Sequence, residues 1–162
     1  MKDILARDIM ITNVVSVNRD APLKEITRLL DKFSFSGLPV VDSEGKVVGI
    51  VSERDVLKYT RWVIGQPLKD PSQLLESEEE PAFVGGQRTH DLIKSVRSVK
   101  ADVVMTDEVI AATEDTSVLD IVRLMNKHNI NRVPIVDENG LLKGLIARAN
   151  ILQMIEKQAD ES

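Results

Sequence analysis

The sequence contains an internal duplication, which limits the folds that this chain can adopt. Residues 10–58 align without a gap on residues 105–153, a shift of 95 positions that places Met10 over Met105. Chance similarity does not keep a proline, an aspartate and two glycines in register over such a length. We therefore expect two copies of one structural unit. The proline, aspartate and glycine residues that are identical in the two copies include Pro39/Pro134, Asp42/Asp137, Gly45/Gly140 and Gly49/Gly144.

Each copy predicts the element order strand, helix, strand, strand, helix. A β-rich run precedes a helix-start signal and an amphipathic helix; a Pro-containing strand, an Asp/Gly turn, a third strand and a closing helix follow. Because proline cannot donate to a ladder, each Pro-containing strand should begin at its proline or lie at a sheet edge. The expected strands are 14–17, 38–41 and 47–51, then 109–112, 133–136 and 142–146, with helices beginning near 23, 54, 118 and 149.

The duplication also predicts the domain organisation. We expect a first repeat over residues 1–60, a connector over 61–99, a second repeat over 100–158 and a tail over 159–162. A unit of about 50 residues buries too little surface to be stable alone. Two βαββα repeats packed face to face, an α+β fold, solve this and leave a pseudo-twofold cleft, a frequent kind of ligand site. The connector is either a solvated link with one packing helix over 91–100, or a lid or partner-docking element.

Composition excludes several classes of function. The net charge of −5 argues against general binding to nucleic acid or an anionic membrane, and no apolar run approaches the roughly 18 residues of a membrane span. The absence of cysteine excludes disulfides, thiolate metal sites and a cysteine nucleophile. Aromatic residues make up only 3% of the chain, so the core should be aliphatic. We expect a cytoplasmic protein, since the N-terminus lacks a signal-peptide pattern.

The copies resemble cystathionine-β-synthase (CBS) repeats, which occur in tandem as the Bateman module. The resemblance covers residues 7–60 and 100–157. It implies a pair that senses cellular state by binding AMP, ADP, ATP or sometimes S-adenosylmethionine between its repeats, with no covalently bound cofactor. It also implies a homodimer. The segments that carry it are 8–10, 37–42, 49–55, 104–106, 132–137 and 144–146.

The segment 49–55 matches the nucleotide motif of that family: Gly, an apolar residue, any residue, Ser or Thr, two residues, then Asp. A carboxylate accepts hydrogen bonds from both hydroxyls of a ribose, which is the role expected of Asp55. Ser52 lies where a strand gives way to a helix, a place where donors suit a phosphate. The alternative is that Ser52 or Glu53 merely caps the helix and Asp55 favours its first turn.

The second copy departs from the motif. Ala147 stands in the place of Ser52, and Asn150 in the place of Asp55. A neutral amide loses the charge-assisted strength of a carboxylate, and alanine offers no hydroxyl. We expect one competent site per chain and a second that is weak or empty.

The resemblance places further ligand contacts. In the γ subunit of AMP-activated protein kinase, the partner repeat supplies basic side chains just before its Pro-containing strand. The equivalent residues here are Asn131 and Arg132, so Arg132 is the phosphate candidate, while Arg148 adds a charge or is a solvated helix-start residue. For adenine, the resemblance indicates backbone and apolar groups, although core packing explains Val14 and Leu38 equally well. The adenine candidates are Asn13, Val14, Val15, Leu38 and Pro39.

No catalytic or metal site is indicated. His90 and His128 lie in different segments without a second ligand at metal spacing, and no nucleophile–base pair stands out. Trp62 either anchors a dimer contact or packs on the connector. The sequence favours a non-catalytic adenine-nucleotide module that signals to an unidentified partner protein. The alternative is a structural dimerisation module with a vestigial ligand site.

Overall fold

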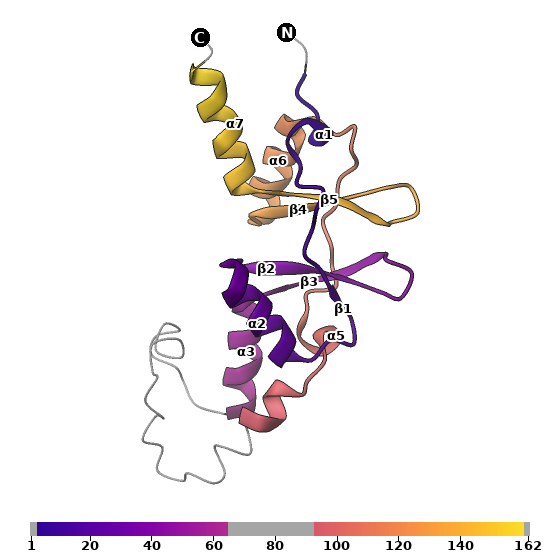
Figure 1. The fold of residues 1–162 in the computed structure, drawn as a ribbon, viewed down its shortest axis with the longest axis vertical. Coiled ribbons are helices and arrows are strands. Elements are labelled where there is room, and N and C mark those ends of the chain that lie inside the picture. Colours follow the sequence, from indigo (N-terminus) through magenta and orange to yellow (C-terminus); the bar gives the residue numbers. More distant parts are fainter. Residues whose placement is uncertain (1–2, 65–92, 161–162) are drawn as a thin grey trace. The chain divides into compact units, whose positions relative to one another are not determined.

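The computed structural model describes residues 3–64 and 93–160, and both copies contain the expected mixture of helices and strands (Figure 1). Most of the connector, residues 65–92, lies outside the described residues, while residues 93–97 of its expected helix are helical. The elements are α1 (Ala6–Ile9), β1 (Val17–Asn18), α2 (Leu23–Phe33), β2 (Gly37–Val41), β3 (Val47–Ser52), α3 (Glu53–Ile64), α5 (Ala101–Val104), α6 (Val118–His128), β4 (Arg132–Val136), β5 (Leu142–Ala147) and α7 (Arg148–Asp160).

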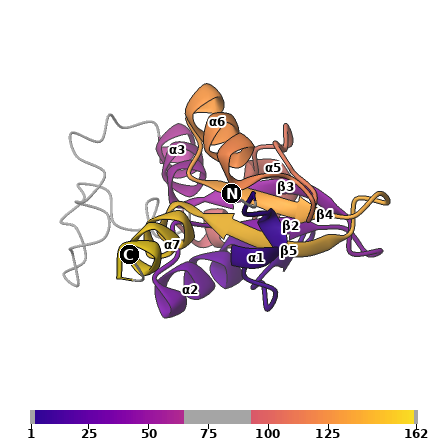
Figure 2. The same cartoon turned by 90° about the horizontal axis from the view of Figure 1, so that it is seen from above.

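The two hairpins form at the predicted turns. Strands β4 and β5 pair antiparallel and lead directly into α7 (Figure 2). In the turn between them, Oδ1 of Asp137 accepts the backbone N–H groups of Asn139 at 2.9 Å and Leu141 at 3.0 Å. Gly140 then takes a φ of +81°, which a residue without Cβ adopts freely. The pairing of an aspartate with a glycine three residues later therefore specifies the turn.

The strands predicted before each amphipathic helix are much shorter than expected. Strand β1 covers only Val17–Asn18, and in the second copy only Ala112 bridges β4. Ala112 donates to the carbonyl of Pro134 at 3.0 Å and accepts the N–H of Val136 at 2.9 Å. Extending this parallel ladder two residues upstream needs an N–H at position 134, which proline lacks. The proline therefore ends the pairing.

The prediction that each proline begins its strand or lies at an edge is wrong for the first copy. Pro39 is the third residue of β2, and β2 lies between β1 and β3. Proline is compatible with this central place because β1 is two residues long and its pairing need not use the missing donor. Pro134 is also the third residue of its strand, in a sheet of only two strands.

The contacts group the described residues into two compact units that interleave the two copies. One, the Asn150 unit, contains residues 3–16, 41–48 and 108–160. The other, the Asp55 unit, contains residues 17–40, 49–64 and 93–107. The short segment that opens each copy thus packs with the main elements of the other copy. The repeat boundaries remain a prediction from the sequence, since contacts divide the chain differently.

In the Asn150 unit, α1 is held by backbone hydrogen bonds to the start of α6. The N–H of Ala6 donates to Thr116 at 2.8 Å, and the N–H of Val118 donates to Ile4 at 2.9 Å. Farther along, Ile11 and Leu145 exchange two backbone hydrogen bonds of 2.9 Å each. A segment from the N-terminus therefore adds itself to the edge of β5.

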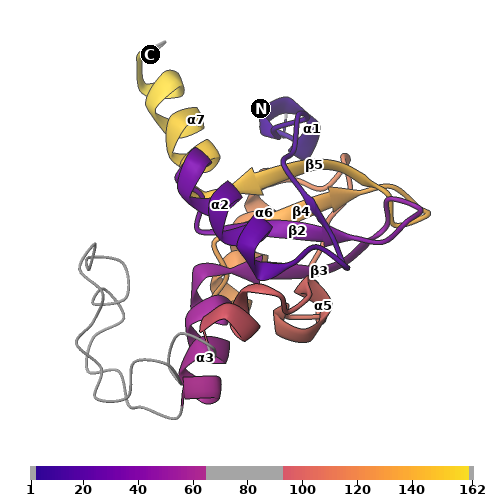
Figure 3. The ribbon, with the colours of Figure 1, turned by 60° about the horizontal axis from the view of Figure 1, so that its bottom comes forward.

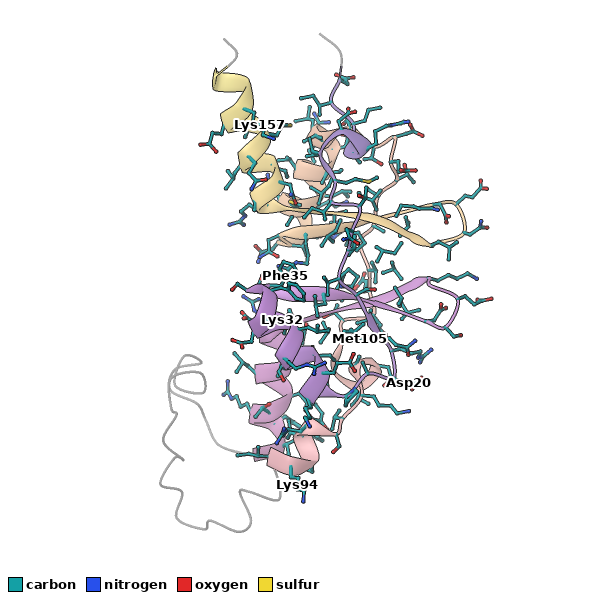
Figure 4. All side chains as sticks on the ribbon, in the orientation of Figure 1. Asp20, Lys32, Phe35, Lys94, Met105 and Lys157 are labelled. Atoms are coloured by element: carbon teal, nitrogen blue, oxygen red, sulfur yellow. The ribbon has the colours of Figure 1, made fainter. Side chains whose placement is uncertain are left out.

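In the Asp55 unit, α5 repeats this arrangement beside α3 and β3 (Figure 3). The N–H of Ala101 donates to Ala21 at 2.8 Å, and Thr106 exchanges hydrogen bonds of 2.8 and 2.9 Å with Ile50. Met105, labelled in Figure 4, packs over Gly49, where an added Cβ would meet its Cγ at 2.9 Å. Gly49 is therefore needed for the close approach of this segment.

The core of each unit is aliphatic, as the composition predicts. In the Asp55 unit Leu23, Ile26 and Leu38 are fully buried, and in the Asn150 unit Ile121, Ile135 and Ile146 are. The described aromatic residues pair instead outside the core: the rings of Phe33 and Phe35 stack, and Tyr59 lies against Trp62. Burial of aliphatic side chains, each worth about 1.5–3 kcal/mol, therefore dominates the stability of both units.

Candidate functional site

The predicted nucleotide motif lies at the junction of β3 and α3, and its two polar residues bind each other. Ser52 ends β3, and its backbone N–H donates to Oδ2 of Asp55 at 2.8 Å. The Ser52 hydroxyl donates to the same oxygen at 2.6 Å, while the N–H of Asp55 donates back to that hydroxyl at 3.3 Å. This reciprocal pattern is a capping box with Asp at its third helical position. The capping role that the sequence left open is therefore present.

A third polar residue, Thr106, reaches this pair from the strand segment after α5. Its hydroxyl donates to Oδ1 of Asp55 at 3.4 Å, and its backbone pairs with Ile50 of β3. Oδ2 thus accepts two hydrogen bonds from Ser52, while Oδ1 accepts a longer one from the exposed Thr106. The sequence reasoning missed Thr106, because a contact over 51 positions follows from neither spacing nor pattern. The feature of the sequence that points to Thr106 is its position directly after Met105, which the duplication aligns with Met10.

In the Asn150 unit, where Ala147 and Asn150 replace Ser52 and Asp55, one of the three hydrogen bonds between these positions is kept. The N–H of Ala147 donates to Oδ1 of Asn150 at 2.8 Å, matching the bond from Ser52 to Asp55. The position equivalent to Thr106 is Ile11, whose backbone pairs with Leu145 as Thr106 pairs with Ile50. The second copy therefore lacks the serine hydroxyl, the carboxylate and the threonine hydroxyl together.

The basic candidates gather in the Asn150 unit at the start of α7. The N–H of Arg148 donates to the carbonyl of Asn131 at 2.9 Å, and Arg132 lies opposite Ala147 in the β4–β5 register. The structure thus brings Asn131, Arg132 and Arg148 together around the degenerate motif. Their pairing with Asp55, which belongs to the other unit, remains a prediction from the family resemblance.

The adenine candidates fall into two groups. Val14 and Val15 are half-buried and Asn13 is exposed, between Ile11 and β1. Leu38 and Pro39 are fully buried in β2, so their side chains contribute to the core of the Asp55 unit. Core packing, the alternative that the sequence kept open for Leu38, is therefore present, and an adenine contact at these positions stays a prediction.

The remaining sequence candidates form no cluster in the described part of the chain. His128 is exposed at the end of α6, and His90 lies outside the described residues. Within 3–64 and 93–160, no group of three His, Asp or Glu side chains is arranged to hold a metal ion. Trp62 is 76% exposed, with its ring 5.9 Å from that of Tyr59. None of the described helices combines the length and apolar character of a membrane span.

Comparison with known sequences gives consistent matches over nearly the whole chain. Residues 6–61 and 99–157 each match the family model of the CBS domain. An uncharacterized protein of Methanocaldococcus jannaschii is 35% identical over 155 residues, which cover 94% of this chain and 91% of that protein. An inosine-5′-monophosphate dehydrogenase of the same organism is 30% identical, but the match covers 91% of this chain and only 23% of the enzyme.

Solved structures share the fold. The CBS domain pair of protein MJ0100, in complex with 5′-methylthioadenosine and S-adenosyl-L-methionine, superposes with a TM-score of 0.68, 22% identity and coverage of 97% of this chain and 99% of that chain. CBSX2 in complex with AMP gives a TM-score of 0.71 at 21% identity, covering 96% of this chain and 98% of its own. The α+β fold predicted from the duplication is confirmed.

Proposed function

The chain belongs to the CBS domain family as a tandem pair, and we propose that it is a non-catalytic regulatory module that binds an adenine nucleotide of the AMP, ADP or ATP type. The observation that carries this proposal is the Asp55 carboxylate, held by Ser52 at the junction of β3 and α3 and faced by Thr106. A carboxylate fixed in this way is preorganised to accept a ribose diol.

The two carboxylate oxygens of Asp55 have unequal parts in this proposal. Oδ2 already accepts two short hydrogen bonds from Ser52. Oδ1 accepts a long hydrogen bond of 3.4 Å from Thr106, so a ribose hydroxyl gains most by binding there. Because the Ser52 hydroxyl is engaged with Asp55, we assign Ser52 to positioning the carboxylate. The phosphates then fall to Arg132, with Asn131 and Arg148 beside it.

The ligands named for the structural neighbours support an adenosine-type compound. One neighbour holds 5′-methylthioadenosine and S-adenosyl-L-methionine, and another holds AMP. Both types share adenine and a ribose diol, which is the part that Asp55 would bind. S-adenosylmethionine is therefore the alternative ligand, and the basic groups at Arg132 and Arg148 favour a phosphate over its sulfonium.

Regulation follows if the ligand favours one arrangement of the pair. We propose that the chain acts as a cytoplasmic homodimer that presents a changed surface to a regulated protein when the nucleotide binds. The shift in population is limited by the difference in ligand affinity between the two arrangements. The partial match to inosine-5′-monophosphate dehydrogenases fits a regulatory segment that also occurs within larger proteins.

A structural dimerisation module is the second candidate function, and one observation favours it. The hydrogen bonds between Ser52 and Asp55 complete the start of α3, so the residues of the motif have a role without any ligand. Under this alternative the motif is retained for helix capping alone.

Isothermal titration of the full chain with AMP, ADP, ATP, NAD and S-adenosylmethionine separates the two functions. If the chain is a nucleotide-binding regulatory module, at least one adenine nucleotide should bind at micromolar concentration and raise the melting temperature. If none of these five compounds binds below millimolar concentration, a nucleotide-binding function is excluded. Sedimentation at the same protein concentrations then shows whether a dimer forms without ligand, as the structural alternative requires.

A further inference from the structure

A pocket of about 590 Å³ lies between α1 and α7, wholly within the Asn150 unit. Its walls are α1 with the residues just before it, and the first three turns of α7. The volume lies in the range of small-molecule sites, roughly 300–1,000 Å³. The pocket includes Asn150 but neither Asp55 nor Ser52, so it is separate from the motif to which we assign the nucleotide.

Four apolar side chains form part of the pocket lining, beside its polar and charged residues. Ile4, Ile9 and Met10 line it from the N-terminal segment, and Met154 lines it from α7. All four are only half-buried and pack against the core of the unit, so their outer surfaces remain open to a ligand. The thioethers of Met10 and Met154 are flexible and adapt to an aliphatic group of variable shape.

The charged residues of the pocket carry opposite signs on its two sides. Asp3 and Asp8 come from the N-terminal segment, and Lys157 comes from α7, where Figure 4 labels it. One oxygen of Asp8 accepts the N–H of Leu5 at 2.9 Å. Among the described residues no ion pair joins Lys157 to Asp3 or Asp8. The opposite charges therefore share a pocket without neutralising each other.

The duplicated sequence shows that this polarity is not required for packing. Val103 stands at the position equivalent to Asp8, and Trp62 at the position equivalent to Lys157. The short helix α5 nevertheless contacts α3 as α1 contacts α7. Since the same helix pair forms with apolar residues at both positions, the charges of Asp8 and Lys157 are not required for the contact between the two helices, and the second oxygen of Asp8 is left for a ligand.

We propose that this pocket binds a small zwitterion with an apolar side chain, the chemistry of a free aliphatic amino acid. Its ammonium group binds the carboxylates of Asp3 and Asp8, and its carboxylate binds the ammonium of Lys157. The aliphatic side chain lies on the apolar lining, while the amides of Asn150 and Gln153 supply further hydrogen bonds. The module would then read an amino acid in addition to the nucleotide.

Calorimetry on the full chain tests this with L-leucine and L-methionine as probes. Two analogues of leucine serve as comparators: 3-methylbutylamine lacks the carboxylate, and N-acetyl-L-leucine lacks the ammonium group. We expect leucine or methionine to bind and each analogue to bind at least about tenfold more weakly, because a hydrogen bond to a charged group is lost. Equal affinity for the amine and the amino acid overturns the zwitterion assignment, as does failure of both amino acids to bind.

Three charge-removing variants locate the site. Asp8→Asn keeps an oxygen for the N–H of Leu5, and Lys157→Gln keeps a polar side chain on an exposed face of α7. Both should weaken amino-acid binding by about tenfold or more, while Lys127→Gln on the exposed face of α6 leaves it unchanged. If the two pocket variants behave like the Lys127 control, the pocket is not the site. Asp55→Asn should weaken nucleotide but not amino-acid binding, so each proposal fails or survives separately.

Discussion

The Ser52 hydroxyl donates to the Asp55 carboxylate across 2.6 Å, and the N–H of Asp55 donates back to that hydroxyl at 3.3 Å. The residues that define the family's ligand motif therefore also define the start of α3. Any substitution at either residue changes helix capping as well as ligand chemistry. Experiments on this site need variants that alter one role at a time. The residues at the equivalent positions of the second copy, Ala147 and Asn150, indicate which substitutions to use.

Replacing Ser52 by alanine isolates the contribution of the hydroxyl to the cap. The N–H of residue 52 can still donate to Asp55, as that of Ala147 donates to Asn150. We expect the free energy of unfolding to fall by about 0.5–2 kcal/mol, the usual cost of losing a serine cap. Urea denaturation measures this. Ala147→Ser is the reciprocal variant, and it should leave stability unchanged or raise it slightly.

Replacing Gly49 by alanine tests the close approach of the strand segment after α5. The new Cβ would lie 2.9 Å from Cγ of Met105 and 3.0 Å from the carbonyl oxygen of Thr106. We expect a loss of roughly 1–3 kcal/mol, typical of overpacking. Combining Gly49→Ala with Met105→Ala relieves part of the clash. A double-mutant cycle should therefore give a favourable coupling energy, and strict additivity would contradict the contact.

Replacing Ile121 by alanine tests the aliphatic core of the Asn150 unit. Ile121 is fully buried in α6, so truncation should cost about 2–5 kcal/mol. Leu119→Ala in the same helix is the matched control, since that side chain is 59% exposed. The control should change stability by less than about 0.5 kcal/mol, as expected for an exposed site. Similar losses in both variants would place Ile121 outside the core.

The turn after β4 should make stability depend on pH in acid. Hydrogen bonds from the backbone N–H groups of Leu141 and Asn139, together with Lys143, hold the pKa of Asp137 below its ordinary value of 3.8. Because the pKa is lowered by folding, the stabilisation is complete above the unfolded value and is lost as the pH falls through the folded value.

Asp137→Asn keeps the acceptor oxygen but removes the titration. Urea midpoints between pH 5 and pH 2 should fall less for this variant than for the unmodified chain. An identical decline in both would show that Asp137 does not carry this dependence.

Much of the fold follows from local sequence. The amphipathic spacing around Ile26 and Ile121 predicts α2 and α6, and the Asp/Gly turns predict both hairpins. The shortened strands required a three-dimensional argument, because the missing N–H of Pro134 matters only once Ala112 lies beside it. The packing of α1 with the second copy and of α5 with the first is equally non-local. Periodicity within a helix does not indicate which part of the chain the helix contacts.

Part of the candidate site also follows from local sequence, and part of it required the structure. Ser52 and Asp55 are three residues apart, so the sequence places them together at a helix start, and the structure does the same. Thr106 lies 51 positions from Asp55 and was not identified from the sequence. Recognising it required the backbone pairing with Ile50, which itself depends on Gly49 leaving room for Met105.

Titration of adenine nucleotides into the Asp55→Asn chain tests whether the Asp55 carboxylate binds the ribose. Asparagine at this position keeps an acceptor for the N–H of residue 52, as Asn150 does for Ala147, so the helix start is preserved while the charge is removed. We predict unchanged folding and an affinity at least about tenfold weaker, because a charge-assisted hydrogen bond to the ribose becomes a neutral one. Unchanged nucleotide affinity in a folded Asp55→Asn chain would show that this carboxylate does not bind the nucleotide.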